Sequence, residues 1–111
     1  MAINIKVKIW NSEDDIGYKQ ITTFFEDFSI ADNFGISAIQ DTYNRAFKSW
    51  KDNYKYLTEL ALVLNKKSWQ HHAENNIRVS ELYAELYYKV RDYALDNLKD
   101  DELTYYIRTT D

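Results

Sequence analysis

Two adjacent histidines, His71 and His72, are the first candidates for chemistry, because imidazole can ligate a metal or transfer a proton near neutral pH. Metal sites on helices usually take histidines from positions i and i+4, which share one face. Neighbouring helical residues instead point about 100° apart. We therefore interpret the pair as a polar helix end, where imidazolium suits the negative end of the helix dipole. We expect no metal, no cofactor and no catalytic residue.

Three acidic clusters, at residues 13–15, 26–27 and 100–102, are the second candidates. Paired carboxylates can perform acid–base catalysis or bind a divalent cation. Most of these residues fall in expected turns or at expected helix N-termini, where capping accounts for them. We expect solvated or capping roles for all three clusters.

Glu59 differs from these carboxylates because it lies among apolar residues of the segment that we expect to be most buried. A buried ionised carboxylate needs a partner. We predict an ion pair with Arg45, Arg91 or Arg108, in a structural rather than a catalytic role.

The composition excludes several familiar kinds of active site. The sequence has no Cys, so it offers no disulfide, thiolate nucleophile or Cys-ligated zinc site. Its two glycines, Gly17 and Gly35, are isolated, so neither a phosphate-binding loop nor a dinucleotide fingerprint can be built. No G-x-S-x-G nucleophile elbow is present. The net charge of −4 and the scattered basic residues argue against general nucleic-acid binding.

The apolar residues form no long continuous run. The longest, LALVL at 60–64, is far shorter than the roughly 18 residues of a membrane span. The opening MAINIKVKIWN alternates apolar and polar residues and does not match a secretory signal peptide. We expect a cytoplasmic protein without membrane association.

Aromatic residues make up 16% of the sequence, and most of them fit helical stripes. Four others fall outside these stripes and are candidates for a partner surface. They are Trp69, Tyr87, Tyr88 and Tyr105. Ordinary surface positions, or packing against an N-terminal hairpin, explain them equally well, so both interpretations stay open.

The N-terminal part of the chain predicts a β-hairpin. Apolar residues alternate with mostly polar ones over 3–10, which is typical of a half-buried strand. A strand needs a partner for its main-chain hydrogen bonds. We assign residues 18–25 as that partner and residues 11–17 as the turn.

The chain after residue 28 predicts helices. A capping pattern at Ser29–Asp32 predicts a short helix over 30–34 that ends at Gly35. A second pattern at Ser37–Gln40 opens a longer helix, along which Tyr43, Phe47, Trp50 and Tyr54 form a core stripe. We expect a break near 52–54, where Asn53 could cap a new helix, and one continuous helix over 37–72 stays an alternative.

Further helices are predicted over 54–72 and 77–98, each with apolar residues at spacings of three and four. A last short helix follows Asp100 or Asp101, and the RTTD end should be loose. The predicted fold is mainly α: a three-helix bundle with short accessory helices and an N-terminal β-hairpin, for which α+β is an alternative label. It forms a single domain over 1–111, with the hairpin at 1–26 and the bundle at 29–111.

Three segments together resemble known proteins: FEDFSIADNFG (25–35), DTYNRAFKSWKDNYKYLTELALVLN (41–65) and LTYYIRTTD (103–111). They are similar to a group of small uncharacterised proteins carried by conjugative and other mobile elements of Gram-positive bacteria. The resemblance covers most of the chain beyond the hairpin. It implies a genetic context, and it implies no activity and no catalytic residue.

The leading functional hypothesis is a non-enzymatic interaction module, an accessory factor of a mobile element that binds a protein partner. One alternative is an acidic inhibitor that mimics DNA with its surface carboxylates. A small DNA-binding protein built on the 37–72 helix pair and a small enzyme of unrecognised type are further alternatives. A homodimer is left open.

Overall fold

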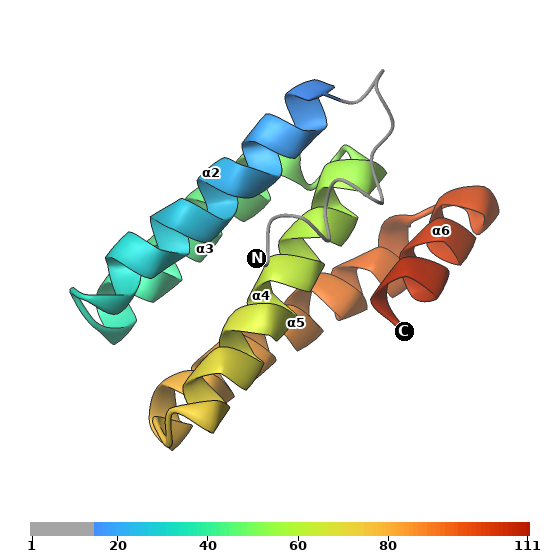
Figure 1. Ribbon diagram of the computed structural model, residues 1–111. Helices are drawn as coiled ribbons and strands as arrows, with labels where there is room; N and C mark the ends of the chain where they lie inside the picture. Colours follow the sequence, from blue (N-terminus) through green and yellow to red (C-terminus); the bar gives the residue numbers. More distant parts are fainter. Residues whose placement is uncertain (1–14) are drawn as a thin grey trace.

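The computed structural model describes the backbone from residue 15 onward and the side chains from residue 24 onward (Figure 1). In chain order the described helices are α2 (Asp15–Asp32), α3 (Ile36–Trp50), α4 (Tyr54–Ala73), α5 (Ile77–Asn97) and α6 (Asp100–Thr110). Short turns connect them, and residues 15–111 contain no strand. The mainly helical bundle that the sequence predicts is confirmed.

The second strand of the predicted hairpin is wrong, because residues 18–25 lie inside α2. Their β-branched and aromatic composition suggested a strand, but packing overrides such local preferences. Phe24, Phe28 and Ala31 are buried and spaced by four and three residues, which places them on one face of a helix. The predicted strand over 3–10 and most of the turn at 11–17 lie outside the described residues.

Helix α4 is the centre of the bundle, since it packs against α2, α3, α5 and α6. Figure 1 shows α2 and α3 side by side, with α6 on the other side of the α4–α5 pair. The buried apolar residues of α4 are Leu57, Leu60, Ala61, Val63 and Leu64. This confirms that residues 54–72 form the most buried helix.

The predicted break near residues 52–54 is confirmed. Helix α3 ends at Trp50 and α4 begins at Tyr54, and the side chain of Asn53 accepts hydrogen bonds from the main-chain N–H groups of Lys55 and Tyr56 at 3.1 and 3.3 Å. The Asn53 side chain thus satisfies two of the four main-chain N–H groups that have no partner within the helix at a helix start. The continuous helix over 37–72 is therefore excluded.

Gly35 lies in the turn after α2, which ends at Asp32, and it is the residue before the first turn of α3, with a positive φ of 103° that favours glycine. The main-chain N–H of Gly35 donates to the carbonyl of Ala31 at 3.1 Å. Helix α2 is longer than the expected 30–34 segment, and Ser29 lies inside it rather than capping it. Ser37 likewise lies in the first turn of α3, which carries no side-chain cap.

The C-terminal end is more ordered than the sequence indicated. Helix α6 continues to Thr110, so most of the RTTD end is helical. Tyr106 is fully buried against the core and holds α6 in place. The N-terminal turn of α6 is closed by Glu102, whose carboxylate accepts the main-chain N–H of Lys99 at 3.2 Å.

Candidate functional site

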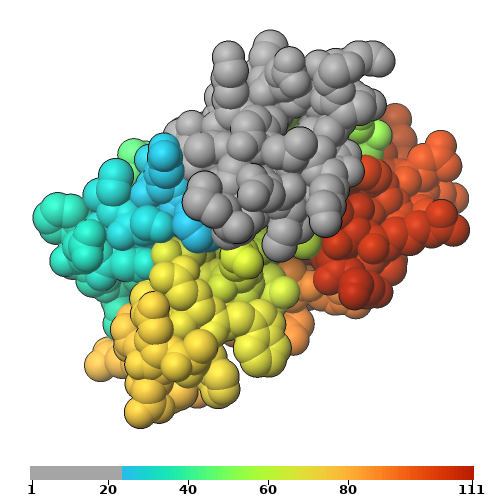
Figure 2. Space-filling view, viewed as in Figure 1, coloured from blue at the N-terminus to red at the C-terminus, as the bar shows by residue number. Residues whose placement is uncertain are grey.

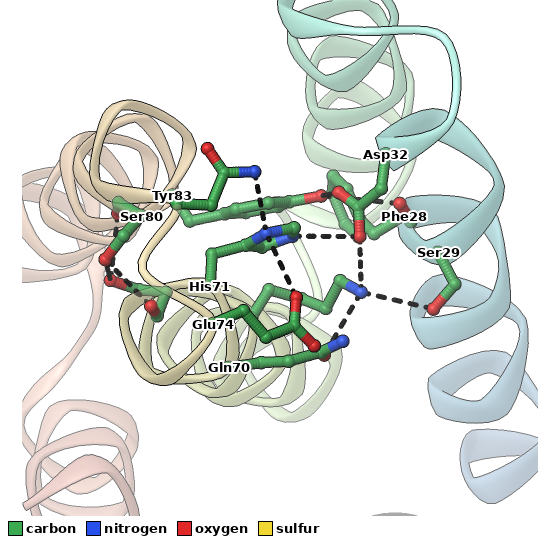
Figure 3. Close-up of polar contacts among 11 residues, drawn as sticks. Phe28, Ser29, Asp32, Gln70, His71, Glu74, Ser80 and Tyr83 are labelled. Atoms are coloured by element: carbon green, nitrogen blue, oxygen red, sulfur yellow. Dashed lines mark hydrogen bonds and ion pairs between the residues drawn. The ribbon is translucent and has the colours of Figure 1, made fainter.

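A polar cluster joins the C-terminal end of α2 to α4 and α5 (Figure 3). The carboxylate of Asp32 is its centre. One oxygen, Oδ2, lies 2.6 Å from Nζ of Lys67 and 3.0 Å from Nε2 of His71. The other, Oδ1, accepts a hydrogen bond of 2.5 Å from the hydroxyl of Tyr83. Lys67, His71 and Tyr83 therefore meet at the carboxylate of Asp32, although each lies at least 35 positions away from it in the sequence.

Lys67 is the most enclosed charge of this cluster, with 1% of its surface exposed. Its ammonium group has three protons to donate. Besides Asp32 it contacts the hydroxyl of Ser29 at 3.2 Å and Oε1 of Gln70 at 3.3 Å. Its Nζ atom also lies 5.1 Å from the centre of the Phe25 ring, and the face of an aromatic ring attracts a cation. A buried ammonium with this set of partners is electrostatically satisfied.

The two histidines of the candidate pair have different environments. Both lie in the last turn of α4, as the interpretation of a helix end requires. His71 is buried and stacks on Tyr83 with the ring centres 5.5 Å apart. Its Nε2 atom is close enough to Asp32 for an ion pair but is not aligned for a hydrogen bond. His72 is exposed and packs edge-on against Trp69.

Burial and the neighbouring carboxylate both keep Tyr83 protonated. Burial raises the pKa of the Tyr83 hydroxyl, and the hydrogen bond to Asp32 and the negative charge of Asp32 raise it further. Burial also raises the pKa of Tyr43 to about 12 and raises the pKa of Tyr106. All three hydroxyls are therefore neutral in the folded protein near neutral pH.

Lysine, histidine, aspartate and tyrosine side chains could transfer protons to a substrate. Here Lys67 and Tyr83 are almost completely buried, so a substrate in solvent would not reach them without a change of structure. Among the side chains from residue 24 onward, no three His, Asp or Glu residues converge as a metal-ligand set. The geometry therefore favours an interhelical connection that fixes the α2–α3 pair on the α4–α5 pair.

Glu59 is fully buried, as the sequence predicts. Two of its predicted partners make other ion pairs within the described part of the chain. Arg45 contacts Asp41 on the surface of α3 at 3.3 Å, and Arg91 contacts Asp111 at 3.9 Å.

The four aromatic candidates for a partner surface lie on three helices and differ in exposure. Trp69 on α4 and Tyr88 on α5 are exposed. Tyr87 is partly buried against the core, and Tyr105 on α6 packs edge-on against Tyr54 with the ring centres 5.3 Å apart. The exposed members of the group are thus Trp69 and Tyr88, which lie on different helices.

A groove between α2 and α3 carries two exposed apolar side chains, one from α2 and one from the turn that follows it. Phe34 is 78% exposed and Ile30 is 58% exposed. They line a hollow of about 200 Å³ whose other walls come from α2 and α3. A second hollow of about 150 Å³ continues toward Trp50 and shares Asp27, Thr42 and Arg45 with the first. The two hollows thus form one groove along the helix pair.

The described acidic clusters lie on different helices. Glu26 and Asp27 are exposed on α2, and residues 100–102 begin α6. In Figure 2 the cyan surface of α2 and the red surface of α6 lie on opposite sides of the molecule. A DNA mimic needs its carboxylates on one face, and the separation of these two clusters disfavours that function.

No protein-family model, no curated protein and no solved structure matches this chain. None of the helices described from residue 15 onward is long and apolar enough to cross a bilayer.

Sequence reasoning missed the Asp32 cluster, although a signal for it exists. Leu60, Leu64, Lys67 and His71 are spaced by four, three and four residues, so a lysine and a histidine continue the buried stripe of α4. Long polar residues in such a stripe require a buried partner. The identity of that partner, Asp32, depends on how α2 packs, which spacing alone does not give.

We predict that Asp32→Asn lowers the free energy of unfolding by about 3–5 kcal/mol, because it leaves the Lys67 ammonium buried without a counter-charge. The double variant Asp32→Asn/Lys67→Met should be more stable than Asp32→Asn alone, since Met fills a similar volume without a charge. Urea denaturation measures both. The control, Asp41→Asn in the exposed pair with Arg45, should cost at most about 1 kcal/mol. Equal losses for Asp32→Asn and Asp41→Asn would contradict the role of the cluster.

The raised tyrosine pKa values predict loss of stability in alkali. Above pH 10 the unfolded chain releases phenolic protons that the folded protein retains, so the free energy of unfolding falls as pH rises. Each such tyrosine contributes about 1.4 kcal/mol per pH unit, and for Tyr43 the stabilisation is present below pH 10 and lost on approaching about 12. Denaturant titrations between pH 10 and about 12 should show that the free energy of unfolding falls less steeply with pH in Tyr43→Phe than in the wild-type chain. An unchanged slope would contradict the assignment.

Proposed function

We propose that this protein is a non-enzymatic protein-interaction module, an accessory factor of a mobile genetic element, that binds a partner protein in the groove between α2 and α3. The observation that supports this most is the exposure of Phe34 and Ile30 along that groove. Burying one such side chain in a complex contributes about 1.5–3 kcal/mol. Apolar anchors of this kind often dominate the energetics of an interface.

The shape of the groove suggests the form of the partner. Two antiparallel helices border it, and its walls extend from Phe34 at the turn to Trp50 at the end of α3. Such a groove suits an amphipathic helix whose apolar residues recur at spacings of three and four. Asp41 and Arg45 in its wall pair with each other, whereas Asp27 is exposed and favours a partner segment that carries Lys or Arg.

The mobile-element context is supported by the resemblance of residues 25–35 and 41–65 to proteins of such elements. The same two segments include much of the groove. An enzyme is disfavoured because the residues best suited to proton transfer, Lys67 and Tyr83, are closed off from solvent.

A photo-reactive phenylalanine analogue in place of Phe34 tests the proposal in cells that contain the protein. We expect it to cross-link to a defined protein, and the purified partner should bind the wild-type chain at least tenfold more tightly than Phe34→Ser, a loss of about 1.4 kcal/mol. The matched control places the same analogue at Trp69, another exposed aromatic residue outside the groove. Identical cross-links at both positions, or none at Phe34, would rule out a specific partner in the groove.

A further inference from the structure

The exposed side of α5 carries a narrow apolar stripe that no other described helix covers. Ile77, Tyr88 and Leu95 are 42%, 57% and 46% exposed. They are separated by eleven and seven residues, so at 3.6 residues per turn they lie within about 20° of one line along the helix. Ala84 is half-buried and belongs to the same line. The stripe runs almost the full length of α5.

Two charged residues complete the stripe. Glu81 is exposed and Arg91 is partly exposed. The order Ile77, Glu81, Ala84, Tyr88, Arg91, Leu95 alternates spacings of four and three, which is the pattern of positions a and d in a coiled coil. Such a pattern on the solvent side of a helix is suited to a second helix.

The stripe is complementary to itself when it is read backwards. Residues 77 and 95, 81 and 91, and 84 and 88 are each placed symmetrically about position 86. An antiparallel second copy would therefore set Ile77 against Leu95, Glu81 against Arg91 and Ala84 against Tyr88. Each layer pairs apolar with apolar, acid with base, or small with large.

We propose that two copies of this chain associate through α5, antiparallel and related by a two-fold axis near position 86. Closed dimers use the same patch on both subunits, which requires this kind of self-complementarity. A parallel pairing would instead set Glu81 against Glu81 and Arg91 against Arg91. Arg91 already contacts Asp111 in a long, partly exposed ion pair, which contributes little and so opposes a new contact with Glu81 only weakly.

This inference goes beyond the proposed function and does not depend on it. The groove for the partner lies between α2 and α3, whereas the stripe lies on α5. A dimer would present two copies of the groove. Loss of either interaction can therefore be observed while the other is intact.

Charge reversal on the stripe tests the proposal. Sedimentation equilibrium of the wild-type chain, from about 1 µM to about 1 mM, should show a reversible dimer. Glu81→Arg and Arg91→Glu should each weaken self-association at least tenfold, because each creates two like-charge contacts. An equimolar mixture of the two variants should form a heterodimer about as tight as the wild-type dimer, since both contacts are then complementary. This recovery also shows that both variants are folded.

The matched control is Lys89→Glu, a charge reversal on the same helix but away from the stripe, which should leave the dimer unchanged. The proposal is overturned by a wild-type chain that stays monomeric over the whole range. It is equally overturned if either single variant dimerises like the wild type, or if the mixed variants stay monomeric.

Discussion

The ion pair between Asp32 and Lys67 is the contact on which the arrangement of the helices depends. Its atoms are 2.6 Å apart, and the lysine is almost entirely removed from water. A buried ammonium is strongly destabilising without its counter-charge. The packing of α2 on α4 must therefore bring residue 32 to residue 67, which leaves little freedom in how α2 is rotated about its own axis.

That rotation determines what the outer surface displays. Ile30 lies two residues before Asp32, so its side chain points about 160° away around the helix. Once Asp32 faces α4, Ile30 faces solvent, and the chain reverses at Gly35 with Phe34 exposed beside it. The groove on α2 and α3 is thus a direct consequence of the buried polar cluster. In the same way Tyr83 faces Asp32 from the inner side of α5, while Tyr88 lies on the outer stripe.

The helices after residue 36 could be predicted from the sequence because each carries a continuous apolar stripe and a recognisable end. Asn53 and Gly35 mark boundaries by local hydrogen bonding and backbone conformation, which depend on nearby residues alone. The segment 18–25 could not be predicted this way. Its local preference favours a strand, and the burial of Phe24 and Phe28 against other helices makes it a helix.

In the candidate site, too, features that depend on nearby residues could be predicted, and features that depend on packing between helices could not. Burial of Glu59 followed from its neighbours on α4. Positions off the apolar stripes did not decide exposure, because Trp69 and Tyr88 are exposed whereas Tyr87 and Tyr105 pack against other side chains. The cluster around Asp32 joins three helices, so no single stripe contains enough of it to be recognised. The exposure of Phe34 depends on where the turn between α2 and α3 lies in space.

Native-state hydrogen exchange tests most directly whether the Asp32 cluster joins the two helix pairs into one cooperative unit. Our account predicts that the amides of residues 28–32 in α2 exchange through the same opening as those of residues 60–64 in α4, with equal free energies and equal dependence on denaturant. If residues 28–32 instead exchange through a separate opening of much lower free energy, α2 and α3 unfold on their own. The cluster would then not be the contact that holds the fold together.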